Sequence, residues 1–235
     1  MIGNKKILAI IPARSGSKGL KNKNLKKINN IPLVGYPVIA AKKSKYIDKI
    51  IISSDSQKIC NIASKYGADI PFLRPKELAT DTSKRSEVIL HCLENIKGYE
   101  IIIYLEPTSP LTNEDDIDYS LEKFIEYNAS SLVSISESNT CHPMYSLKFN
   151  DNSKEIKPYL SDSFKNLVVN RQDLEKVYFF DGSLYISTVK KFLVEKEFYH
   201  DDTKGIILSG YKSIEIDDIE DFKIVEFLLN NLNEK

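Results

Sequence analysis

The stretch from Ile10 to Asn24, IIPARSGSKGLKNKN, places small and basic residues directly after an apolar run. Gly16 and Gly19 allow the backbone to turn its N–H groups toward a ligand. Open α/β sheets bind ligands where a strand passes into such a loop. Positive charge comes from Arg14, Lys18, Lys21 and Lys23. The sequence therefore indicates a polyphosphate-binding loop and a nucleotide-using enzyme, against the alternative of a surface loop with solvated lysines.

Two common glycine motifs are absent from the sequence. The spacing GxxxxGK[ST] of Walker-type phosphate loops does not occur, and neither does the GxGxxG of dinucleotide-binding folds. A dinucleotide-dependent oxidoreductase is therefore disfavoured.

Two acidic residues near the C-terminus, Glu215 and Asp217, are two positions apart in SIEIDD, on a predicted strand. Alternate residues of a strand point to the same face, so the two carboxylates would lie together. Adjacent acids are tolerated best with a cation between them, and Mg²⁺ beside a triphosphate suits this role. An exposed acidic strand end before a helix is the alternative. We predict that this pair binds Mg²⁺.

Further polar segments follow other predicted strands. They offer hydroxyls and guanidinium groups that can bind phosphate, a nucleobase or a carboxylate. Each is also compatible with an ordinary turn or a surface ion pair, so each is weak when taken alone. These residues are Arg74 with the turn 80–83, Thr108 with Ser109, and Arg171, Gln172 and Asp181.

Composition limits the class of partner. Lys plus Arg and Asp plus Glu number 33 each, so the formal net charge is zero and binding to nucleic acid or an anionic membrane is not expected. Three widely spaced cysteines and three scattered histidines form neither a disulfide framework nor a zinc pattern. Without a secretory signal or a membrane-length apolar run, the expected location is the cytoplasm, with reduced thiols.

Alternating apolar and polar segments predict an α/β fold with a mostly parallel sheet flanked by helices. We expect strands at 7–12, 48–55, 68–75, 100–105, 131–136 and 182–187. Helices are expected at 34–44, after a cap at Asp55 or Ser56, and at 86–95 and 115–128. A C-terminal helix would pack on the sheet through Phe222, Val225, Leu228 and Leu229.

The segment 139–175 is irregular and polar, with a strand-like piece at 145–149. Its length exceeds that of an idle loop in a compact domain, so we expect an arm or a partner-binding flap. The predicted organisation is one domain over 1–235 with this arm inserted.

Seven segments, read in chain order, resemble the acylneuraminate cytidylyltransferases, also called CMP-sialic acid synthetases. The resemblance covers nearly the whole chain, and the segments are IPARSGSKGLKNKN, ISSD, LRPKELATDT, EPTSPL, NRQDL, DGSLYI and IEIDDIEDF. It implies a Rossmann-like fold, a protruding arm used for homodimerisation, and Mg²⁺-dependent transfer of CMP from CTP to a keto-sugar acid such as a sialic-type nonulosonic acid.

The resemblance also implies residue roles by motif position. For the nucleotide it implies Arg14, Ser15, Lys18, Lys23, Asn24, Arg74, Thr82 and Ser83. For the sugar acid it implies Glu106, Thr108, Ser109, Arg171, Gln172 and Asp181, and for Mg²⁺ it implies Glu215 and Asp217. Lys23 and Asp217 are the predicted catalytic residues. The anomeric hydroxyl would attack the α-phosphate, with Asp217 or a metal-bound hydroxide accepting the proton.

The chain departs from the family pattern at four positions. Glu106 stands where Gln is frequent, Thr112 where Arg is frequent, Asp181 where Asn is common, and Glu215 where Asp is usual. An added carboxylate near a sugar acid needs a donor or cation to offset repulsion, which suggests an amino-substituted or more polar sugar. The alternatives are another keto-sugar acid, such as an octulosonate, and a non-catalytic nucleotide-binding paralogue.

Overall fold

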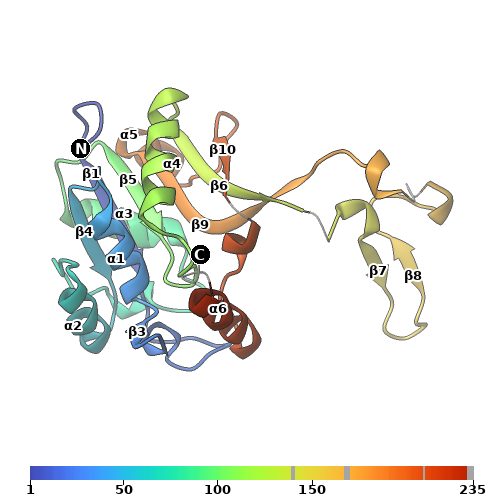
Figure 1. Ribbon diagram of the computed structural model, residues 1–235, viewed down its shortest axis with the longest axis horizontal. Coiled ribbons are helices and arrows are strands. Elements are labelled where there is room, and N and C mark those ends of the chain that lie inside the picture. The colour runs from blue at the N-terminus through green and yellow to red at the C-terminus, as the bar shows by residue number, and fades with distance from the viewer. Residues whose placement is uncertain (139–140, 167–169, 209, 232–235) are drawn as a thin grey trace.

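A six-stranded sheet forms the centre of the computed structural model, which describes residues 1–138, 141–166, 170–208 and 210–231, without the side chains of Asn166 and Arg171. The strand order is β10-β6-β9-β5-β1-β4 (Figure 1). Strand β9 runs antiparallel to its neighbours β5 and β6, and the other pairs are parallel, which confirms the mostly parallel sheet. The strands are β1 (Ile7–Pro12), β4 (Lys49–Ser53), β5 (Ile101–Leu105), β6 (Ser131–Glu137), β9 (Tyr178–Thr188) and β10 (Lys204–Ile207).

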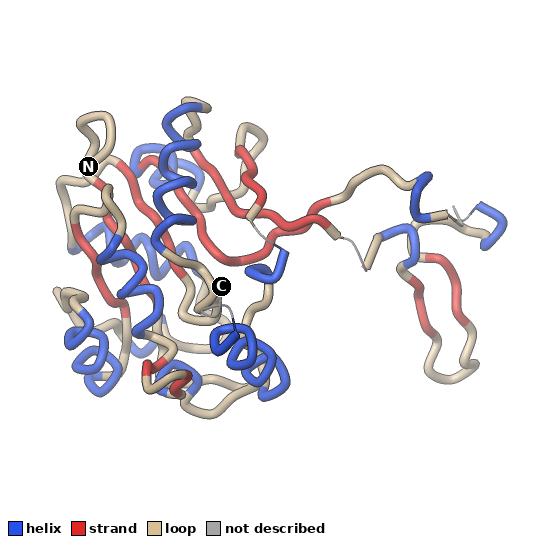
Figure 2. Tube along the Cα trace, viewed as in Figure 1, coloured by secondary structure: helices blue, strands red, loops and turns tan. Residues whose placement is uncertain are grey.

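Helices cover both faces of this sheet (Figure 2). On one face of the sheet lie α1 (Gly35–Lys43), α2 (Gln57–Tyr66) and α4 (Glu114–Glu126), and on the other face lie α3 (Arg85–Asn95) and α5 (Val189–Glu195). Both faces of β1 are therefore buried, which explains its unbroken apolar sequence. The expected cap is Ser56, whose hydroxyl accepts from the Ile59 N–H at 3.4 Å.

The C-terminal helix α6 (Ile219–Asn231) buries the expected apolar residues, but the prediction that they pack on the sheet is wrong, because they pack against loop segments instead. Phe222 and Val225 are buried in a third cluster with Leu20, and Leu228 and Leu229 pack against the same cluster. This cluster packs α6 against the loop that follows β1. Among the described residues, no helix has the length and apolar character needed to cross a bilayer.

The prediction of a strand at 68–75 is wrong. Only an isolated bridge between Asp69 and Ile51 forms there, and the chain then runs without regular structure toward Arg74. Pro71 and Pro75 lack the N–H groups that a strand ladder requires.

The predicted arm projects from the body of the molecule (Figure 1). Its described residues form a two-stranded ribbon, β7 (Leu147–Phe149) and β8 (Ile156–Pro158), together with short 3₁₀ turns. Residues 139–140 and 167–169 of the predicted segment 139–175 lie outside the described residues. Large apolar side chains are exposed on the arm, and they are Leu147, Phe149, Ile156, Tyr159, Leu160 and Phe164.

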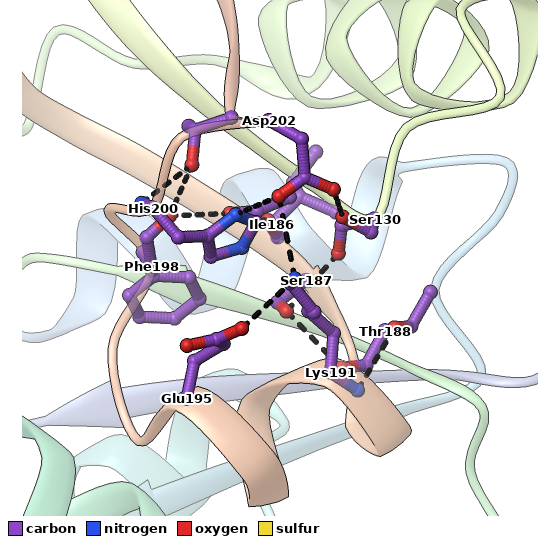
Figure 3. Close-up of polar contacts among 11 residues, drawn as sticks. Ser130, Ile186, Ser187, Thr188, Lys191, Glu195, Phe198, His200 and Asp202 are labelled. Atoms are coloured by element: carbon purple, nitrogen blue, oxygen red, sulfur yellow. Dashed lines mark hydrogen bonds and ion pairs between the residues drawn. The ribbon is translucent and has the colours of Figure 1, made fainter.

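A polar network holds the turn before β10 against the sheet (Figure 3). The Asp202 carboxylate accepts from the Ser130 hydroxyl at 2.9 Å, lies 2.6 Å from His200 Nδ1 and pairs with Lys191 at 3.3 Å. Hydrogen bonds from Ser130 and Lys191 hold the pKa of Asp202 well below its usual range. This turn follows Phe198, which is fully buried against Tyr185 of β9.

Candidate functional site

A pocket of about 560 Å³ opens at the carboxyl ends of β1 and β5. The basic loop after β1, the turn before α3, the segment after β5 and Asp217 all contribute to its wall. Charged lining residues are Arg14, Lys18, Lys23, Arg74, Arg85, Asp81, Glu106 and Asp217. Five cations against three acids make this pocket suitable for a strongly anionic ligand.

Internal contacts shape the basic loop on one side of the pocket. The Asn24 side-chain amide is buried and donates to the Arg14 carbonyl at 2.9 Å. Lys23 Nζ donates to the Ile216 carbonyl at 2.8 Å and to Asp217 Oδ1 at 3.1 Å. A Cβ at Gly19 would overlap the Asp217 carbonyl, so this glycine permits the close approach of two distant segments. Lys23 therefore lies where the loop meets the C-terminal acids.

Arg74 forms part of the pocket floor, although no strand leads to it. Its side chain is buried, and its Nε donates to Ser53 Oγ at 2.9 Å. Another of its N–H groups donates to the Ser53 carbonyl at the end of β4. Burial lowers the pKa of Arg74 from its ordinary value. These bonds fix the guanidinium rigidly at the carboxyl edge of the sheet.

The turn 80–83 forms another part of the pocket wall and is held by its own hydroxyls. Ser83 Oγ accepts from the Thr80 N–H at 3.0 Å and donates to the Glu77 carbonyl at 3.1 Å. Thr80, Asp81 and Ser83 line the pocket, while Thr82 is not among the lining residues. Thr82 instead lies 3.2 Å from Thr80, hydroxyl to hydroxyl.

The C-terminal acids do not form the expected strand. Residues 214–217 have no regular structure, because the Ile216 N–H bonds singly to the Thr108 carbonyl and the Asp217 N–H bonds to the Asp221 carboxylate. Ile216 is nevertheless fully buried, between the half-buried Glu215 and the exposed Asp217, and of the two acids only Asp217 lines the pocket.

The surroundings of Glu215 disfavour its ionised form. Burial, followed by the negative charges of Glu106 and Asp217, raises the pKa of Glu215 to about 7. Its carboxylate packs against Gly182, where a Cβ would overlap it. Among the described residues no group of three or more acids, histidines or cysteines is arranged to hold a metal. Two carboxylates with excess negative charge still suit Mg²⁺, which takes its other ligands from water and phosphate.

Several predicted residues lie away from the pocket wall. Ser15 donates through its N–H and hydroxyl to Asp55, at 2.8 and 2.6 Å. Ser109 is buried, and its hydroxyl has no partner among the described residues. Gln172 lies on the arm, and so does Arg171, whose side chain is not described. None of these four is among the lining residues, whereas Thr108 is. Their roles remain predictions.

Asp181 is buried inside the sheet. It accepts hydrogen bonds from the hydroxyls of Ser134 and Ser136 on β6, and from the Ser183 N–H at 3.0 Å. Both oxygens of the carboxylate therefore accept hydrogen bonds from within the protein. Its negative charge also contributes to the raised pKa of Glu215.

Among the lining residues that the sequence analysis did not assign to the site, two are central to its chemistry. Arg85 is the first residue of α3, and Tyr104 is on β5. The sequence signal for Arg85 was its place directly after the polar turn 80–83, at the start of a helix. Asp81 was named only as part of that turn, yet it contacts both Arg14 and Lys18.

Comparison with known proteins places these features in a family. Residues 8–233 match the family model for cytidylyltransferases. A CMP-N,N'-diacetyllegionaminic acid synthase from Legionella pneumophila is 32% identical over 229 residues, covering 95% of this chain and 96% of that protein. A pseudaminic acid cytidylyltransferase from Campylobacter jejuni is 30% identical and covers 95% of this chain and 96% of its own length.

Solved structures show the same fold. A CMP:2-keto-3-deoxy-manno-octonic acid synthetase complexed with CTP aligns with a TM-score of 0.71, over 97% of this chain and 99% of that chain. The two sequences are 13% identical, so this likeness concerns the fold.

Proposed function

The chain belongs to the cytidylyltransferase family of nucleotidyltransferases, and we propose that it transfers CMP from CTP to a nonulosonic sugar acid, releasing pyrophosphate. The observation that supports this most directly is the pocket where five cations converge with the C-terminal acid Asp217. Relatives named for diacetyllegionaminic and pseudaminic acids support an acylamino-substituted nine-carbon acid as acceptor, rather than an octulosonate.

Nucleotide binding falls to the basic loop and Arg74. Arg14 and Lys18 lie on one side of the pocket and would bind the phosphates, while the fixed guanidinium of Arg74 would bind the cytidine side. Asn24 supports this arrangement by holding the loop backbone through the Arg14 carbonyl. The chain supplies positioning and charge neutralisation, as phosphoryl-type transfers require.

The acceptor hydroxyl would attack the α-phosphorus, forming a P–O bond while the bond to the pyrophosphate oxygen breaks. Lys23, held by Ile216 and Asp217, would neutralise charge on the phosphate oxygens. The exposed Asp217 carboxylate would accept the proton from the attacking hydroxyl. Glu215 and Asp217 would hold Mg²⁺, which supplies charge stabilisation on the transferring phosphate when it is bound.

The arm supports a homodimer as a further proposal. Its exposed apolar side chains, Leu147, Phe149 and Ile156 among them, are more than a lone soluble chain usually leaves uncovered. Light scattering of the full chain tests this, with the monomer mass as the contradicting result. A cytoplasmic location likewise remains a prediction, which cell fractionation tests.

Pyrophosphate release tests the proposed function. We expect release with CTP and Mg²⁺ in the presence of a nonulosonic acid, and none with ATP, GTP or UTP. The acceptor panel comprises N,N'-diacetyllegionaminic, pseudaminic, N-acetylneuraminic and 2-keto-3-deoxy-manno-octonic acids. CTP binding without release across the panel would contradict the catalytic proposal and favour a binding-only paralogue.

A further inference from the structure

Arg85 lies on a floor made by two buried tyrosines. Tyr104 of β5 and Tyr185 of β9 are directly paired across the sheet, and they are 4% and 3% exposed. The Arg85 guanidinium carbon lies 4.1 Å from the Tyr185 ring centroid and 5.5 Å from that of Tyr104. The guanidinium is therefore held by stacking on the two rings.

A partly buried acid lies beside this guanidinium. Glu106 follows β5, and its Oε1 lies 3.9 Å from Arg85 Nε, farther than a hydrogen bond. Burial raises the pKa of Glu106, and the charges of Arg85 and Lys23 oppose that shift. Both partners keep part of their surface open to the pocket, with side-chain exposures of 30% and 21%. A hydrogen-bond donor and an acceptor thus lie side by side on one wall.

The location of Arg85 is costly for the fold and needs another explanation. As the first residue of α3, it places a positive charge at the positive end of the helix dipole. Folding alone would be served by a neutral or acidic residue there. Arg14 pairs with Asp81 of the turn before α3, and Lys23 pairs with Asp217 of the C-terminal segment. Arg85 instead faces Glu106, the acid that follows β5.

We propose that Arg85 determines acceptor specificity by binding an oxygen of the sugar acid that lies against Glu106. The inference rests on the proposed function, because it assigns the acceptor side of the same pocket. The oxygen is a carboxylate or an acyl carbonyl, and both are hydrogen-bond acceptors matched to a guanidinium. Glu106 accepts from an adjacent N–H or O–H of the same acceptor.

The test compares Arg85→Met and Arg85→Lys with wild type, using Lys84→Met as a matched control on the exposed residue before the helix. Acceptor affinity is measured by calorimetry on CTP-loaded protein in EDTA, and both KM values are measured by pyrophosphate release. We expect Arg85→Met to weaken acceptor binding by roughly tenfold or more, with the CTP value unchanged. Arg85→Lys keeps the positive charge but lacks the planar guanidinium, so it should retain only part of the acceptor affinity of wild type.

Two acceptors distinguish the bound oxygen. A carbonyl contact makes the loss larger with N-acetylneuraminic acid than with 2-keto-3-deoxy-manno-octonic acid, whereas a carboxylate contact makes the losses equal. Unchanged acceptor affinity, or a parallel loss of CTP affinity, would overturn the proposal. If wild type binds the acid without releasing pyrophosphate, the proposed function fails and the affinity comparison still decides on Arg85. Absence of acid binding to wild type would overturn both.

Discussion

Asp81 Oδ1 lies 2.7 Å from Arg14 Nη1, and the other carboxylate oxygen lies 3.0 Å from Lys18 Nζ. One acid of the turn before α3 therefore bridges two cations of the basic loop. Hydrogen bonds from Lys18 and Arg14 hold the pKa of Asp81 below its usual range. The carboxylate occupies the place at which the two cations would meet phosphate, so it competes with the nucleotide for them.

Replacing this competitor should strengthen nucleotide binding. We expect Asp81→Asn to lower the KM for CTP by up to about fivefold, because partly exposed ion pairs contribute little. Steady-state kinetics at two salt concentrations measures this. Asp69→Asn, which breaks the surface pair with Lys49 at 2.6 Å, is the matched control. A higher KM for CTP in Asp81→Asn would show that Asp81 organises the basic loop and does not compete with the nucleotide for its cations.

Asp217 should be needed for turnover more than for nucleotide binding. Its carboxylate is 78% exposed yet lies 3.1 Å from Lys23 Nζ, at the junction of the loop and the C-terminal segment. We expect Asp217→Asn to reduce kcat by about 100-fold at saturating Mg²⁺, the scale typical of a lost proton acceptor. Asp201→Asn, on an exposed turn, is the control. Full turnover in Asp217→Asn would contradict both of its predicted roles.

The basic loop could be predicted because its residues are contiguous and follow one buried strand. Arg14, Lys18, Lys23 and Asn24 are within eleven positions of one another, and all four line the pocket. Local chemistry is sufficient for such a site, since the strand end fixes where the loop lies.

Arg85 could not be assigned in this way. Its surroundings depend on the cross-strand pairing of Tyr104 with Tyr185, which is a property of the antiparallel strand β9. The pattern of apolar and polar residues along one strand does not show which residue of another strand will pair with it. Similarly, 68–75 has apolar residues typical of a strand, but its prolines and the single bridge at Asp69 leave it irregular. Long-range pairing therefore decided the surroundings of Arg85, whereas the prolines in 68–75 were a local signal against a strand.

Gly182 offers a test of how Glu215 is placed. Gly182 has a φ of 73°, and a Cβ there would overlap the Glu215 carboxylate. We expect Gly182→Ala to lower kcat by at least about tenfold and to raise the Mg²⁺ concentration that gives half-maximal activity. Gly98 has a φ of 89° with open space around it, so Gly98→Ala reproduces the backbone strain alone. Equal kinetics in the two variants would show that Glu215 has no part in turnover.

Glu215 should also make stability depend on pH. Its pKa in the fold is about 7 against an ordinary 4.5, so the folded protein binds this proton more tightly than the unfolded chain. The free energy of unfolding should therefore fall as pH rises from about 4.5 to about 7, by an amount on the order of 2 kcal/mol, and level off above that. Urea unfolding in EDTA at pH 5, 6, 7 and 8 measures the slope.

Glu215→Gln should remove most of that slope, whereas Glu220→Gln, on an exposed turn of α6, should keep it. Adding Mg²⁺ should stabilise wild type more at pH 8 than at pH 5, because only the ionised carboxylate binds the cation. The same slope in both variants would assign the pH dependence to another group. An equal Mg²⁺ effect at the two pH values would contradict a metal site at Glu215, since protonation at pH 5 must compete with the cation for the same oxygens.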